Sequence, residues 1–391
     1  MSEGAPIGFI WWALPTLMRS RGVPIEHITG LTSLLVLPWA LKFVWAPLID
    51  ILRHRWSLRY WILSSQVLMG MTLLPLLVLN WEQQFPLVTL FLILHSLLAA
   101  TQDVSIDALC ILVTGAHERG SLNGWMQAGM LTSRALLGGG ALILLKSIGL
   151  GGVLALLLAV VWGSSLFILA SRESEGLGRR AAGAPSFLQS LRSTIRFKAT
   201  WFGLLFAAVG GAGYEAVGAV AGPFMIDKGF SSEQVGWFFL IPAIVSTIAG
   251  SVLGGMIADR MRRLFSVRLF LATMAASVLL MAGLQTLNLP PSHPLYVVGL
   301  TVLYFCIGLF VASTYALFMD LTNPELGATQ FSTYMGATNF CESWSTFAVG
   351  RFVGAWGYAV AFLLMGLVSL SMMPVVGKLV PRQPASTDGA T

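Results

Sequence analysis

The sequence contains few charged residues. Of its 391 residues, only 10% are charged and 56% are hydrophobic, whereas a soluble protein carries roughly 25% charged residues. A water-soluble protein of this length could not cover its surface with the 23 basic and 17 acidic side chains present. This scarcity excludes a disordered chain, a soluble enzyme and a nucleic-acid-binding protein. It indicates a protein that crosses a membrane many times.

Cysteine is also scarce, and the common catalytic motifs are missing. The three cysteines, Cys110, Cys306 and Cys341, lie in apolar segments and form no CxxC pair, which predicts neither a disulfide framework nor a thiolate metal site. The sequence has no GxSxG, HExxH or Walker A motif, and its partial dinucleotide pattern at 211–213 has no strand before it. We therefore predict no enzymatic activity, no cofactor and no bound metal.

Long apolar segments are abundant. A helix needs about 20 apolar residues to cross about 30 Å of hydrocarbon, and an open strand edge is not stable in lipid. The first segment is short and follows Met1 almost directly, so no cleavable signal peptide is visible and we expect its helix to begin before the first residue. Charged and Pro/Gly-rich positions divide the chain into twelve predicted spans, near 5–19, 28–48, 59–80, 86–113, 121–146, 151–171, 200–224, 233–257, 266–287, 295–320, 329–354 and 357–380.

Basic residues are distributed unequally between the two sets of loops. One set contains sixteen Lys and Arg residues and the opposite set contains four, with three more inside spans. Because cytoplasmic loops carry the excess of Lys and Arg, this distribution places both termini in the cytoplasm. The expected partners are the lipid bilayer, a small-molecule substrate and protons, and we expect the protein to be a monomer.

The longest loop divides the spans into two groups of six. Residues 1–171 form the first predicted bundle and 200–380 the second, with a cytoplasmic linker at 172–199 and a tail at 381–391. The linker sequence SFLQSLRSTIRFK has apolar residues at helical spacing, which predicts an amphipathic helix lying on the membrane surface. A regulatory binding site in the linker is the alternative.

Several charged residues and glycines of the first group of spans have counterparts in the second group, about 207 residues later in the sequence. Glu26 aligns with Glu233, Glu118 with Glu325 and Gly129 with Gly336, in one consistent order. Parallel repeats of this kind occur in transporters that bind substrate near the bilayer midplane. We therefore predict an all-α polytopic membrane protein with twelve transmembrane helices in two pseudo-symmetric six-helix bundles.

Two loops share a pattern of an aspartate followed by basic residues. Asp50 precedes Arg53 after the second span, and Asp259 precedes Arg260 after the eighth. This doubled pattern resembles the loop motif of the major facilitator superfamily. A carboxylate beside arginines can hold two helices together in one state and release them in another, which needs only a few kcal/mol of difference between the states. Plain positive-inside topology explains the arginines but not the paired aspartates.

Further motifs resemble one group within that superfamily. The stretches LPWALKFVWAPLID at 37–50, ATQDVSIDA at 100–108 and EGAPIGF at 3–9 are similar to signatures of the AmpG-like permeases and the related acetyl-CoA transporters, and the triplet Glu118-Arg119-Gly120 also fits. The resemblance implies a secondary importer of the bacterial inner membrane that carries solute from periplasm to cytoplasm.

The substrate expected from this resemblance depends on the branch. Permeases that import peptidoglycan fragments (anhydro-muropeptides) tend to be longer and to carry two more helices, whereas a compact branch imports siderophores through one polypeptide of about this size. The shortness of the chain and its 13 Trp residues favour a siderophore, ferric or free. Muropeptide import, for which the interior offers little fixed charge, and export by the same fold are the alternatives. A membrane receptor without net transport is a hypothesis from another class.

Few ionisable residues lie inside the spans of the first half. Inserting one such side chain at the bilayer centre costs at least about 2.5–3.5 kcal/mol of free energy. Asp103 and Asp107 are four residues apart on one helical face. Two nearby carboxylates repel one another, so one of them can bind and release a proton near neutral pH. The alternative for Asp103 is an ion pair with Arg134. Lys42 either extends to the cytoplasmic interface or attracts an anionic substrate.

The second half contains its own intramembrane charges. Glu215 lies among closely spaced glycines, which indicates helix packing, yet no basic residue is near it in sequence and it is a candidate for protonation. Asn339, Glu342 and Thr346 share one helical face, which predicts a polar stripe toward the cavity. Asp320 precedes an Asn-Pro break, where a gate or capping residue is expected.

The sequence has no nucleotide site, so we expect an ion gradient, namely protons, to drive transport. The predicted site residues fall into three groups. For proton coupling or substrate binding we predict Asp103, Asp107, Arg134, Glu215 and Glu342. For the substrate cavity we predict Trp11, Trp12, Gln102, Gln127, Tyr214, Asn339 and Lys42, because a mid-span indole can stack on a ring-bearing ligand. For a cytoplasmic gate we predict Asp50, Arg53, Glu118, Arg119, Asp259, Arg260 and Asp320.

Overall fold

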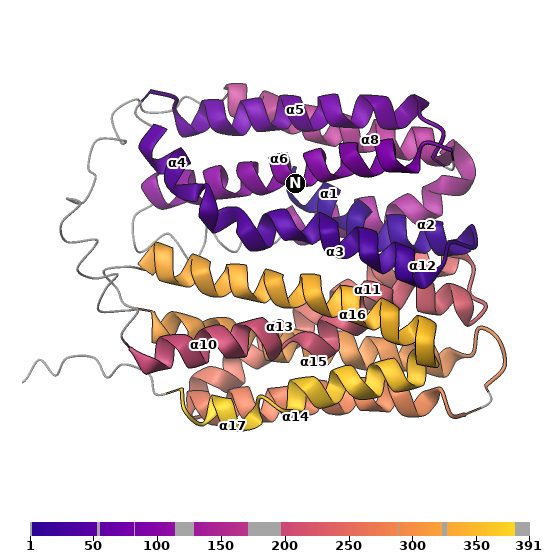
Figure 1. Cartoon of the computed structure of the whole chain (residues 1–391), viewed down its shortest axis with the longest axis vertical. Coiled ribbons are helices and arrows are strands. Elements are labelled where there is room, and N and C mark those ends of the chain that lie inside the picture. Colours follow the sequence, from indigo (N-terminus) through magenta and orange to yellow (C-terminus); the bar gives the residue numbers. More distant parts are fainter. Residues whose placement is uncertain are drawn as a thin grey trace, which may run out of the picture.

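The computed structural model describes residues 2–52, 55–81, 83–113, 129–170, 197–287, 289–322 and 327–379, with the backbone alone for 47, 50, 51, 110–113, 259 and 327–329. Every regular element in these ranges is a helix (Figure 1), in agreement with the predicted fold class. The first half contains α1 (Gly4–Gly8), η1 (Phe9–Ala13), α2 (Leu14–Ser20), α3 (Ile25–Leu41), η2 (Lys42–Val44), α4 (Ala46–Leu52), α5 (Leu58–Val78), α6 (Phe85–Val113), η3 (Leu136–Gly140) and α8 (Ala141–Ala170). The second half contains α10 (Lys198–Val209), α11 (Ala212–Asp227), α12 (Ser232–Phe238), η5 (Phe239–Ala243), α13 (Ile244–Arg260), α14 (Arg263–Leu284), α15 (Pro294–Leu321), α16 (Gly327–Leu370) and α17 (Met373–Val376).

The described helices account for the twelve predicted spans. In the described ranges, nine helical segments are long and apolar enough to cross a membrane. Two of them reverse direction at a glycine with positive φ, Gly149 in α8 (φ 65°) and Gly357 in α16 (φ 77°), a conformation that glycine adopts without steric cost. Dividing each at its glycine gives eleven segments, and the helix from α1 through α2 is the twelfth. Both glycines fall where the sequence predicts a break between spans.

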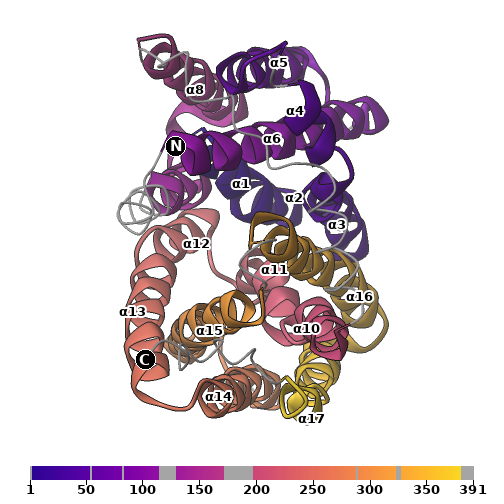
Figure 2. The ribbon, with the colours of Figure 1, turned by 90° about the vertical axis from the view of Figure 1, so that its left-hand side faces the viewer.

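The helices form two bundles that meet along a central seam. Figure 1 shows the first half, from indigo to magenta, above the second half, from rose through orange to yellow, and Figure 2 shows the same two groups end-on. We call the end at which α8 finishes and α10 begins the linker end, and the end that contains Arg19 the Arg19 end. Described basic residues predicted to be cytoplasmic lie at the linker end: Arg59 donates to Leu169 near the end of α8, and Lys378 lies over Phe202 of α10.

Small residues allow α3 and α16 to pack closely on one side of the seam. A Cβ atom added to Gly350 or Gly354 would overlap the side chains of Thr29 and Glu26 on α3. The Ser343 hydroxyl donates a hydrogen bond of 2.9 Å to a backbone oxygen of α3. Packing in a membrane depends on such small residues and interhelical hydrogen bonds. The contact holds the two halves together along most of the length of α3.

Three π-helical segments lie at the seam, one each in the first, fifth and eighth spans. They are η1, η3 and η5, and η3 contacts both of the others. The sequence explains two of them, because proline has no backbone N–H to donate to the carbonyl four residues before it. Pro15 is the second residue after η1, and Pro242 lies inside η5. Such π-helical turns often occur at functional sites, and here they mark the place where the two halves face one another.

Several predicted features lie outside the described residues. Arg53, Glu118, Arg119 and Gln127 are among them, as is most of the predicted linker. Asp50 and Asp259 are described by their backbone only, near the ends of α4 and α13, and Arg260 is exposed at the last residue of α13. The latch predicted for these loops therefore stays a prediction.

Candidate functional site

An aromatic pair crosses the seam between η1 and η5. The indole of Trp12 stacks on Phe239, with ring centroids 4.7 Å apart and planes 9° from parallel. The guanidinium carbon of Arg134, two residues before η3, lies 4.6 Å from the centroid of the Trp12 ring. Such a cation over an indole is attracted by the electrons of the ring. Sequence analysis selected Trp12 and Arg134 but missed Phe239, whose only signal was the nearby Pro242.

A second tryptophan links the first half to α16. The Trp11 indole N–H donates a hydrogen bond to the Glu342 carboxylate, and its ring meets Trp39 edge-on at 5.3 Å between centroids. Asn339, one turn before Glu342, donates to the backbone oxygen of Trp39 at 3.4 Å. Thr346, one turn after Glu342, is also buried. The polar stripe predicted for α16 therefore faces the seam.

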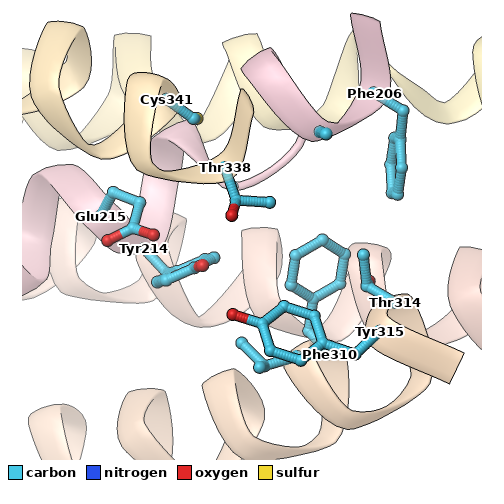
Figure 3. Close-up of a pocket in the computed structure, with 11 residues that line it drawn as sticks. Phe206, Tyr214, Glu215, Phe310, Thr314, Tyr315, Thr338 and Cys341 are labelled. Atoms are coloured by element: carbon cyan, nitrogen blue, oxygen red, sulfur yellow. The ribbon is translucent and has the colours of Figure 1, made fainter. Parts of the chain in front are cut away.

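A narrow cavity lies beside this cluster, within the second half. Its lining comes from α10, α11, α15 and α16 and comprises Phe206, Ala207, Gly211, Tyr214, Glu215, Phe310, Val311, Thr314, Tyr315, Thr338 and Cys341. Figure 3 shows Tyr214 and Glu215 projecting from α11 toward the residues of α15 and α16. Tyr214 and Glu215, two predicted site residues, thus meet in one cavity.

Near the centre of the seam, one cation, Arg134, lies close to two carboxylates of the described residues. Glu215 and Glu342 interact electrostatically with each other and with Arg134. The Nε atom of Arg134 is buried and has no hydrogen-bond partner among the described residues. If both carboxylates are ionised, the group has one excess negative charge, and burial makes that state costly. The group can therefore bind a proton, an anion, or both.

A second charged cluster lies toward the linker end of the first half. The Lys42 ammonium is 2.6 Å from Asp103 Oδ2, and the two side chains are only 14% and 9% exposed. Glu3 and Asp107 interact electrostatically with the same pair. The ion pair considered between Asp103 and Arg134 is not formed, because the Asp103 carboxylate pairs with the Lys42 ammonium instead. The Lys42 side chain therefore extends toward Asp103 inside the first bundle, at the start of the 3-10 turn Lys42–Val44.

Gln102 belongs to a hydrogen-bonded network inside the first half. It donates to the Ser2 hydroxyl at 2.6 Å, Gln66 donates to the same oxygen at 3.3 Å, and Ser165 donates to Gln66 at 2.7 Å. Gln102 is 1% exposed, and this network ties together four spans of one bundle. The predicted place of Gln102 beside the substrate cavity is therefore wrong.

We expect the Lys42–Asp103 pair to be essential for folding stability. Replacing Lys42 with Met leaves the Asp103 carboxylate buried without its cation, and breaking a buried pair in this way costs about 3–5 kcal/mol. In a thermal unfolding scan in detergent, K42M should melt well below the wild type. Adding Asp103→Asn to K42M should restore most of the loss. Equal melting of K42M and the wild type would show that the pair does not stabilise the fold.

A charged latch joins the halves at the Arg19 end. The Arg19 Nε atom is 2.6 Å from Asp227 Oδ1, a second guanidinium nitrogen is 2.9 Å from Oδ2, and Tyr358 donates to Oδ2 at 2.8 Å. Such a two-point arginine–carboxylate contact is strong and directional. Sequence analysis counted Arg19 only as a loop cation. The available signal was the repeat, because Arg19 and Asp227 are 208 residues apart, close to the offset of the two halves.

A further ion pair lies near the linker end of the second half. Asp320 accepts from Arg263 at 2.8 Å, and the two side chains are 38% and 24% exposed. Arg263 begins α14 and Asp320 lies near the end of α15. This position agrees with the predicted place of Asp320 near the cytoplasmic loops, while its role at a gate stays a prediction.

Comparison with known families and curated proteins gives consistent matches over the whole chain. The model of the Major Facilitator Superfamily matches residues 2–350. The chain is 24% identical over 385 residues to a protein of Rickettsia conorii named as the transporter AmpG 4, which covers 94% of this chain and 91% of the relative. It is 25% identical over 394 residues to the anhydromuropeptide permease of Escherichia coli, which covers 98% of this chain and 78% of the permease.

Solved structures give the same fold. A crystal structure of a D-xylose–proton symporter superposes with a TM-score of 0.78 at 12% identity and covers 97% of this chain and 96% of that one. A variant of the nucleoside transporter NupG superposes with a TM-score of 0.72 at 13% identity, with 97% and 98% covered. At these identities the likeness shows the fold alone.

Proposed function

Since the chain belongs to the Major Facilitator Superfamily and is a multi-pass membrane transporter, we propose that it imports peptidoglycan fragments, anhydro-muropeptides, across the bacterial inner membrane together with protons. The main support for this substrate is the similarity to the anhydromuropeptide permease of Escherichia coli over 98% of the chain. Trp11, Trp12 and Phe239 are buried at the seam in this structure. When the halves separate, these rings can stack against sugar rings, and Arg134, Glu215 and Glu342 can meet charged groups of the peptide.

The expectation of a siderophore has no support among the relatives. It rested on the shortness of the chain, but the Rickettsia conorii relative named AmpG 4 has a similar length, since the match covers 91% of it. It rested also on the 13 Trp residues, whose rings suit sugar rings equally well. The separate argument against a muropeptide was the apparent lack of fixed charge in the interior. The fold gathers Arg134, Glu215 and Glu342 from three separate helices at one place, so the interior is richer in charge at the seam than the sequence suggests.

The proposed transport cycle alternates access from the two ends of the seam. In this structure the Arg19–Asp227 latch joins the halves at the Arg19 end, which we assign to the periplasmic side because described basic residues of the predicted cytoplasmic loops lie at the linker end. Opening toward the periplasm requires this latch to break, and re-forming it requires the halves to rock about the seam. Protons are the proposed driving ion because carboxylates are the principal titratable groups at the seam and in the linker-end cluster.

The substrate proposal is tested by a thermal-shift comparison on the purified protein in detergent. We expect N-acetylglucosaminyl-anhydro-N-acetylmuramyl-tripeptide to raise the melting temperature, because a ligand that binds only the folded state stabilises it by mass action. A ferric trihydroxamate siderophore and N-acetylglucosamine alone serve as comparisons and should have no effect. A shift with the siderophore and none with the muropeptide would overturn the proposal.

A further inference from the structure

The Arg134 side chain is placed to receive an anion at the centre of the seam. Its guanidinium carbon lies over the Trp12 ring, and Trp12 in turn stacks on Phe239 of the other half. A guanidinium remains charged at any physiological pH and offers five N–H donors in a fixed planar arrangement. Its Nε atom is buried without a hydrogen-bond partner in the described part of the chain. A buried donor left unsatisfied is costly, so a ligand acceptor at this point would be favourable.

Among the described residues, no carboxylate forms a direct ion pair with Arg134. The ion pairs within 4.0 Å that the described residues form involve Arg19, Lys42 and Arg263, not Arg134. Glu342 accepts the indole N–H of Trp11. Glu215 lies in the neighbouring cavity beside Tyr214. The two glutamates therefore balance the charge of Arg134 from a distance, and its Nε–H has no acceptor among the described residues.

We propose that Arg134 binds a carboxylate of the transported molecule, and that Glu342 and Glu215 take up a proton when this carboxylate arrives. The inference rests on the proposed function and adds to it a ligand group and a coupling rule. A carboxylate binds a guanidinium through two parallel hydrogen bonds, and the peptide part of a muropeptide carries carboxylates beside ring-bearing sugars that Trp12 can contact. The ligand class is thus a carboxylate with a ring system next to it.

The coupling follows from charge balance in a buried site. With no ligand, one guanidinium faces two glutamates, and a ligand carboxylate adds a third negative charge to the same group. Three carboxylates around one cation are much less stable than two in a medium of low dielectric, so binding favours protonation of a glutamate. The other titratable groups that act on this set come from α11, α15 and α16: Tyr214, Tyr304, Tyr315 and Cys341. Lys42 of the linker-end cluster acts on Tyr315.

The test compares two forms of one ligand in proteoliposomes. The probes are N-acetylglucosaminyl-anhydro-N-acetylmuramyl-tripeptide with free carboxylates and the same molecule with its carboxylates amidated. The wild type should take up the free acid with the lower KM. Arg134→Gln should raise the KM of the free acid about 10- to 100-fold, the loss expected for a charge-assisted hydrogen-bonded pair, and should leave the KM of the amide unchanged. Arg134→Lys should retain part of the preference, because it keeps the charge but not the planar donors.

Arg351→Gln is the matched control, because Arg351 also lies over an aromatic ring, that of Phe347, but is exposed on α16. It should keep the wild-type preference. A second readout is proton uptake: adding the free acid to weakly buffered protein in detergent should remove protons from the medium for the wild type and not for Arg134→Gln. Uptake of both forms with equal KM, or an Arg134→Gln protein that keeps the preference, refutes this inference and leaves the proposed function standing. A wild type that takes up neither form refutes both.

Discussion

Glu342→Gln is expected to abolish proton-driven accumulation while leaving the fold intact. A glutamine oxygen can still accept the hydrogen bond that Trp11 donates to Glu342, so the contact between the halves is preserved and only the titratable group is lost. For each proton that moves with the substrate, an inward gradient of one pH unit supports about tenfold accumulation, since one pH unit corresponds to about 1.36 kcal/mol. We expect the variant to equilibrate substrate across the vesicle membrane without concentrating it.

The measurement is the ratio of internal to external muropeptide in proteoliposomes with an imposed pH gradient and the membrane potential clamped. Glu233→Gln is the control, because Glu233 is exposed in the first turn of α12, at the Arg19 end. It should accumulate substrate like the wild type. Wild-type accumulation by the Glu342→Gln protein would show that Glu342 does not carry the proton.

Gly139→Ala is expected to lower the transport rate by roughly 5- to 150-fold. The backbone of Gly139 in η3 faces the backbone of Gly236 and Leu240 across the seam, and a Cβ atom at Gly139 would overlap these backbone atoms. Backbone in two packed helices cannot yield as a flexible side chain can, so the halves must separate at this point. Overpacking costs about 1–3 kcal/mol, and here it destabilises only the state in which the helices meet. A difference of this size shifts the equilibrium between the states by roughly 5- to 150-fold.

The neighbouring glycine provides the control. A Cβ atom at Gly140 would have its nearest neighbour 3.9 Å away, at the backbone oxygen of Ala135, so Gly140→Ala should transport like the wild type. Both variants change one hydrogen to one methyl group in the same π-helical segment. Initial uptake rates compare the two, with thermal unfolding of each to confirm that both fold. Equal rates for the two variants would indicate that closure of this contact is not part of the cycle.

The fold was predictable because its signals are local in sequence. Each span is a run of apolar residues of membrane length, and Gly149 and Gly357 interrupt the two merged helices where the sequence analysis separates spans five and six and spans eleven and twelve. The pairing of the halves also follows from the repeat. These signals need no knowledge of which helix face meets which neighbour.

The partners of the site residues were harder to predict. An ion pair with Arg134, on the next span, was the alternative considered for Asp103, yet Asp103 pairs with Lys42 of the second span. Apolar spacing shows where the spans lie but not which side chains of neighbouring spans meet. Phe239 was missed because one phenylalanine in an apolar span looks like every other, and only the packing of η1 against η5 distinguishes it.

The three charged groups lie at different levels along the seam and its first bundle. The Arg19–Asp227 latch lies at one end, Arg134 with Glu215 and Glu342 lies near the centre, and the Lys42–Asp103 cluster lies toward the linker end. The central group joins three spans from both halves beside Trp11, Trp12 and Phe239, and it lies away from both ends of the seam. It is therefore the place where substrate binding and proton binding can affect one another.

Uptake of N-acetylglucosaminyl-anhydro-N-acetylmuramyl-tripeptide by proteoliposomes of the wild-type protein tests the central claim most directly. Three conditions are compared: outside more acidic than inside by one pH unit, equal pH, and the reverse gradient, each with the membrane potential clamped. Proton-coupled import predicts about tenfold accumulation per coupled proton in the first condition, equilibration in the second and depletion in the third. Uptake that is the same in all three conditions, or no uptake in any of them, would contradict it.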